Sequence, residues 1–92
     1  MPGQDTVEAR KAEADNQVMK VIASEYRMAP SDIARETLLR EGGLDLDNIE
    51  LLVLSTVIER AFCGLIQVDV GRLVVSVNVG EVCDYIATLI LV

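Results

Sequence analysis

The segment from Asp47 to Phe62 constrains the fold of this chain more than any other part of the sequence. Asp47 can cap a helix, and Glu50 stands three residues later, which is the spacing of a capping box. The apolar residues that follow recur at helical spacing: Leu54, Val57, Ile58, Ala61 and Phe62. Residues 51–53 are also apolar, so we expect this helix to be central and contacted on more than one side.

A first helix is predicted near residues 7–28. Asp5 and Glu8 again have capping-box spacing, so the helix is expected to start near Thr6 or Val7. Its apolar stripe consists of Val18, Met19, Ile22, Ala23 and Tyr26. Pro30 is expected to end the helix, because a proline disfavours helical geometry at the residue before it.

A last helix is predicted over residues 79–88. Asn78 can cap it and Glu81 occupies the box position. The stripe of this helix consists of Val79, Val82, Cys83, Ile86 and Ile90. The final four residues are all apolar, so they are expected to pack on the domain or to meet a partner.

Two connecting segments are less regular. Residues 30–46 are predicted as a long loop, anchored to the core by Ile33, Leu38 and Leu39 and bent at Gly42-Gly43. Residues 65–79 alternate apolar and polar side chains on both sides of Gly71, which is typical of a β-hairpin. A lone hairpin is rarely stable, and no third strand is evident, so an irregular segment remains the alternative.

These patterns predict an all-α fold, a bundle of three main helices plus the variable segment 65–79. A chain of 92 residues with 51% hydrophobic content suits one modest core. We interpret residues 1–17 as an N-terminal helical extension or leader and residues 18–92 as the domain. No signal peptide and no run long enough to span a bilayer are evident, so a cytoplasmic protein is expected.

The charge of the chain narrows its partners. Eight basic residues against fifteen acidic ones give a net charge of −7. An acidic surface repels phosphate backbones, so nucleic acid is not an expected partner, whereas proteins with basic docking patches are. Histidine is absent, and Cys63 and Cys83 form no C-x-x-C pair, so neither a zinc site nor a Ser/His/Asp set is predicted. We therefore expect a protein that is not an enzyme and binds no metal.

Two segments together resemble the acyl carrier protein family. One is Leu46-Asp47-Asn48-Ile49-Glu50-Leu51, which runs on to Ile58-Glu59-Arg60-Ala61-Phe62. The other is Asn78-Val79-Gly80-Glu81-Val82-Cys83-Asp84-Tyr85-Ile86. Members of that family open their second helix with Asp-Ser-Leu or Asp-Ser-Ile, end it with Glu-x-x-Phe, and open the last helix with Thr-Val-Gly-Asp and Asp-Tyr-Ile. The resemblance covers roughly residues 18–88 and implies a strand-free helical bundle.

The resemblance places Asn48 where the family carries its 4′-phosphopantetheine cofactor. In the family a serine after the capping Asp forms a phosphodiester with this arm, and the helix N-terminus favours the phosphate. Asp47 is present, but the amide of Asn48 offers no hydroxyl, so the cofactor is not expected on the chain as written. In a second register, Gly43-Leu44-Asp45-Leu46-Asp47 resembles Gly-Leu-Asp-Ser-Leu-Asp without the serine. A modified serine omitted from a written sequence would favour that register.

The resemblance implies a carrier or docking partner in fatty-acid, polyketide or related acyl metabolism. Its docking residues would be Glu50, Leu51 and Glu59, which meet basic patches on acyl-transferring enzymes. The second helix has few acids for this family, and the third is normally acidic, so the usual fatty-acid synthase partners are not expected. Asn48 is either natural in an armless docking subunit or a replacement in a working carrier. A monomer is expected, with a homodimer as the alternative.

A different class of function stays open. The chain could be a helical dimerisation module with no acyl-carrier role, using its apolar C-terminus and residues 65–79 as the interface.

Overall fold

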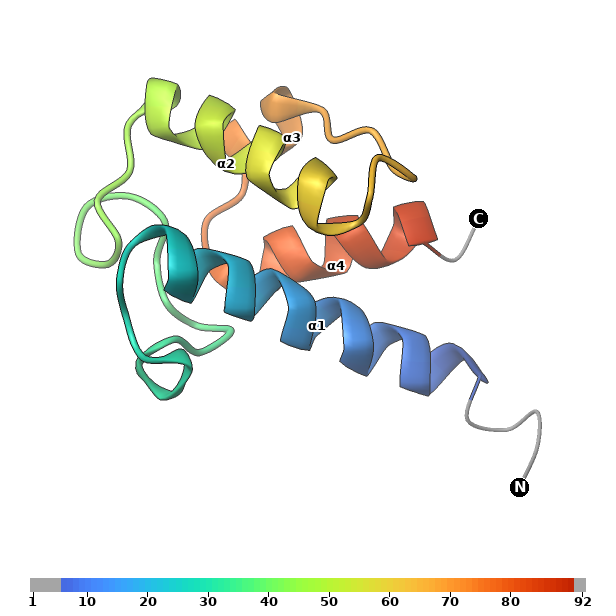
Figure 1. Cartoon of the computed structure of the whole chain (residues 1–92). Coiled ribbons are helices and arrows are strands. Elements are labelled where there is room, and N and C mark those ends of the chain that lie inside the picture. The colour runs from blue at the N-terminus through green and yellow to red at the C-terminus, as the bar shows by residue number, and fades with distance from the viewer. Residues whose placement is uncertain (1–5, 91–92) are drawn as a thin grey trace.

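The computed structural model of this chain describes residues 6–90 and is all-helical there. Four α-helices run in the order α1 (Thr6–Glu25), α2 (Asn48–Ala61), α3 (Val70–Val74) and α4 (Val79–Ile90), with a 3₁₀ turn at Pro30–Asp32. Figure 1 shows α1 and α4 side by side, with α2 above them and the short α3 next to α2. The all-α prediction is confirmed for the described residues.

The core lies between the helices, with α1 packed against both α2 and α4 and α3 packed against α2. One stripe from each helix, together with side chains from the two long connections, forms a single buried cluster. Its largest fully buried members are Val18, Ile22, Leu39, Leu51, Leu54, Ile58, Leu73, Val79, Val82, Cys83 and Ile86. The packing of three apolar stripes, rather than the propensity of any one helix, therefore stabilises the bundle.

Helix α1 continues through the predicted boundary between residues 17 and 18. Ala14 is fully buried, whereas residues 8–13 are exposed. The helix ends at Glu25, earlier than the sequence predicted, and Pro30 does not end it. Instead Arg27 takes a left-handed conformation with φ of 56°, and the Met28 N–H donates to the Ala23 carbonyl at 2.8 Å. This arrangement is a Schellman-type end, which needs no proline.

Helix α2 has the predicted start but a narrower buried face. Leu51, Leu54 and Ile58 are fully buried, while Phe62 and Ala61 are half-buried at its end. Leu52 and Val53 are exposed, so the prediction that they widen a buried stripe was wrong. The reason is geometric, because α2 packs against α1 and α3 and its remaining face is uncovered within the described chain.

Residues 65–79 do not form the hairpin that their alternation allowed. Asp69 accepts a hydrogen bond from the Gly71 N–H at 2.9 Å and so starts α3, which buries Leu73. In the described chain, strand-like pairing is limited to one isolated bridge between Leu38 and Asn78. The cap and the burial of one leucine thus outweigh the period-two pattern of the valines.

The loop between α1 and α2 is anchored partly as predicted. Ile33 and Leu39 are buried, but Leu38 is exposed by 38%, and Leu46 is buried instead. A Cβ atom on Gly43 would lie 2.0 Å from the Leu38 carbonyl oxygen, so a side chain cannot fit there. The glycine allows this close approach of the backbone, which positions Leu46 and the start of α2.

Candidate functional site

The start of α2 is organised by a complete capping box. The Glu50 N–H donates to Asp47 Oδ1 at 2.8 Å, and the Asp47 N–H donates to Glu50 Oε1 at 3.0 Å. These two acids were predicted as a cofactor-site residue and a docking residue. In the structure both carboxylates bind backbone N–H groups of the same turn, so their first role is to fix where α2 begins.

Asn48 is the first residue of α2, and its side chain is exposed. The Arg40 guanidinium donates to Asn48 Oδ1 at 2.8 Å and to the Leu46 carbonyl at 3.3 Å. Arg40 therefore orients the amide and ties the preceding loop to the helix start. In the second register the serine would stand beside Leu46. Leu46 is buried and precedes the capping residue Asp47, so that position lies outside the first turn of α2.

The serines of the chain do not replace the missing hydroxyl. Ser55 and Ser76 are buried, and their hydroxyls donate to the carbonyls of Leu52 at 2.6 Å and Arg72 at 2.7 Å. Ser24 lies in the last turn of α1, and Ser31 lies in the 3₁₀ turn after a proline. No serine of the described residues occupies a capped helix start.

Two of the predicted docking residues, Leu51 and Glu59, are engaged within the chain instead of being presented to a partner. Leu51 is fully buried in the core and is therefore unavailable to a partner. The half-buried Glu59 accepts a hydrogen bond from the Val68 N–H at 2.7 Å, which ties the loop after α2 back to the helix. This carboxylate is engaged within the chain rather than presented freely on its surface.

The exposed side chains of α2 are mainly apolar. Ile49 is exposed by 73%, Leu52 by 54% and Val53 by 44%. Sequence reasoning assigned residues 51–53 to the buried side and so missed this surface. The spacing of these three residues is itself helical, at i, i+3 and i+4, and could have signalled a second face.

Tyr26 lies close to the same end of α2. Its hydroxyl is buried without a hydrogen-bond partner among the described residues. Burial, followed by the nearby charges of Glu50, Glu25 and Asp47, raises the pKa of this phenol to about 12. The group therefore stays protonated at neutral pH and offers no base to the site.

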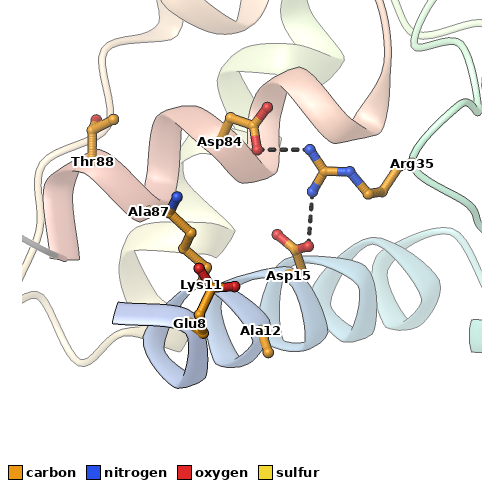
Figure 2. Close-up of a pocket in the computed structure, with 8 residues that line it drawn as sticks. All are labelled: Glu8, Lys11, Ala12, Asp15, Arg35, Asp84, Ala87 and Thr88. Carbon is orange, nitrogen blue, oxygen red and sulfur yellow. Dashed lines mark hydrogen bonds and ion pairs between the residues drawn. The ribbon is translucent and has the colours of Figure 1, made fainter. Parts of the chain in front are cut away.

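A second cluster lies between α1 and α4 and was missed by the sequence analysis. The Arg35 guanidinium contacts Asp15 of α1 and Asp84 of α4, each at 2.7 Å (Figure 2). It also donates to the Gly80 carbonyl at 3.3 Å. A Cβ on Gly80 would lie 3.1 Å from both Cβ and the carbonyl oxygen of Arg35, so this glycine permits the close approach.

This Arg35 cluster borders an open groove of about 590 Å³. Its lining, drawn in Figure 2, consists of Glu8, Lys11, Ala12, Asp15, Arg35, Asp84, Ala87 and Thr88. The hydrogen bond that the Arg35 guanidinium donates to Asp84 is the largest effect on the pKa of Arg35, which it raises. The arginine is held by two carboxylates, and the lining contains no thiol or imidazole. We therefore interpret the Arg35 cluster as a structural clamp that joins α1, the loop before α2, and α4.

The two cysteines do not form a reactive pair. Cys63 is exposed at the end of α2, and Cys83 is fully buried in α4. Burial raises the pKa of the Cys83 thiol to about 12, with the charge of Asp15 as the next cause. Cys83 is thus a protonated core residue.

The described residues hold no group of three or more potential metal ligands. Among their helices, none combines the length and apolar character needed to cross a bilayer. Comparisons with models of protein families, with curated proteins and with solved structures found no match for this chain. The functional interpretation therefore depends on the start of α2 and on the surface beside it.

Proposed function

We propose that this chain is an acyl-carrier-like docking protein of fatty-acid, polyketide or related acyl metabolism that carries no phosphopantetheine arm. One observation carries the proposal: Asn48 is exposed as the first residue of α2, directly after the capping residue Asp47. In the family that the sequence resembles, this is the place of the arm-bearing serine. The all-helical fold, with a short helix between α2 and α4, is compatible with that resemblance.

The chemistry of the site supports an armless form. Attachment of the arm needs a hydroxyl oxygen that attacks the pyrophosphate of coenzyme A, and an amide cannot supply it. Arg40 further holds the Asn48 amide in place at 2.8 Å. A protein with this site would act through contacts with partner enzymes and not through transfer of a thioester.

The docking surface would combine long-range electrostatic attraction with an apolar contact. The net charge of −7 favours approach to basic surfaces, as the resemblance implies. The acids of α2 are engaged in hydrogen bonds within the chain, whereas Ile49, Leu52 and Val53 are free to be covered. Affinity would therefore come mainly from apolar burial beside Asn48.

Intact-protein mass spectrometry with coenzyme A and a broad-specificity phosphopantetheinyl transferase tests this proposal. The chain as it stands should gain no mass, and Asn48→Ser should gain one phosphopantetheine. Asn48→Ala is the matched control, since it also loses the contact with Arg40 but offers no hydroxyl. Modification of the unaltered chain, or failure of folded Asn48→Ser to be modified, would contradict the carrier reading of this position.

A helical interaction module without an acyl-carrier role is the second candidate. The exposure of Leu65, Val75 and Val77, by 86%, 70% and 57%, favours it, because all three lie in the segment that this reading uses as an interface. The C-terminal part of that interface includes the half-buried Leu89 and Ile90, while residues 91–92 lie outside the described residues. Binding of a partner that is lost with Val75→Glu and kept with Leu52→Glu would favour this module.

A further inference from the structure

We draw no further inference here: the strongest candidate, the exposed apolar face of α2 at Ile49, Leu52 and Val53, carries none, because nothing in the described part of the chain shows what covers it.

Discussion

Replacement of Arg35 by methionine should destabilise the fold by about 1–2 kcal/mol, because it removes the clamp between three parts of the chain. Methionine keeps the aliphatic stem beside Gly80 but loses the guanidinium that contacts Asp15 and Asp84 at 2.7 Å each. The Arg35 side chain is 42% exposed, so solvent screens both ion pairs and each contributes well below the value of a buried pair. A charged hydrogen bond to each carboxylate accounts for the estimate of about 1–2 kcal/mol.

Thermal unfolding followed by circular dichroism measures this effect. For a domain of this size, about 1–2 kcal/mol corresponds to a decrease in Tm of about 5–15 °C. Arg10→Met is the matched control, because it removes the same charge from an exposed site without an ion pair among the described residues. Arg35→Lys should lie between wild type and Arg35→Met, because an ammonium group lacks the fork that reaches both carboxylates.

Salt dependence separates the ion pairs from the packing of the stem. The difference in Tm between wild type and Arg35→Met should decrease as salt screens the two pairs. If Arg35→Met and Arg10→Met unfold at the same temperature, the Arg35 clamp contributes nothing to the stability of the fold. Equal stability of Arg35→Lys and wild type would show that one contact is enough.

Two further predictions concern Glu59 and Cys83. Glu59→Ala should cost about 1–2 kcal/mol and lower the hydrogen-exchange protection of the Val68 amide, whereas Glu59→Gln keeps an acceptor and should cost less. Unchanged hydrogen-exchange protection of the Val68 amide in Glu59→Ala would show that Glu59 does not hold this amide. The fully buried Cys83 thiol has its pKa raised from 9.0 to about 12, so the unfolded chain loses this proton first as the pH rises. Between about pH 9 and 11 wild type should lose up to about 1 kcal/mol more per pH unit than Cys83→Ala, as measured by urea unfolding. Free energies of unfolding that change in parallel with pH in wild type and Cys83→Ala would contradict this prediction.

The helices could be predicted from the sequence because their signals are local. Asp47 with Glu50 marks the start of α2, and both partners of the capping box lie within one turn. Asn78 likewise accepts from the Glu81 N–H at 2.9 Å at the start of α4. Such caps depend on spacing alone, so they need no knowledge of tertiary structure.

The faces of the helices and the contacts between distant segments could not be predicted in the same way. Leu51 and Leu52 are neighbours of the same residue type, yet one is fully buried and the other is 54% exposed. Which of them is buried depends on where α1 and α3 pack. Arg35 meets Asp15 and Asp84 across 20 and 49 residues of sequence, and no local pattern indicates that contact.

The alternation of apolar and polar residues over 65–79 indicated a hairpin that the structure does not contain, for a related reason. Period-two spacing is a β signal only when a neighbouring strand pairs with it. Here the Tyr85 hydroxyl accepts from the Asp69 N–H at 2.8 Å, and Asp69 in turn caps α3. One long-range hydrogen bond, accepted by Tyr85 of α4, thus accompanies a short helix where the alternation allowed a strand.

We propose that the start of α2 is a carrier-like docking surface without its arm. A titration of isotope-labelled chain with a phosphopantetheinyl transferase, followed by backbone amide shifts, tests this proposal. At constant chain concentration, we expect saturable shifts centred on Asn48, Ile49, Leu52 and Val53, with no accompanying gain of mass when coenzyme A is added. Absence of shifts, under conditions in which a known carrier protein binds the same transferase, would contradict the proposal. Shifts confined to α1 or α4 would contradict it equally.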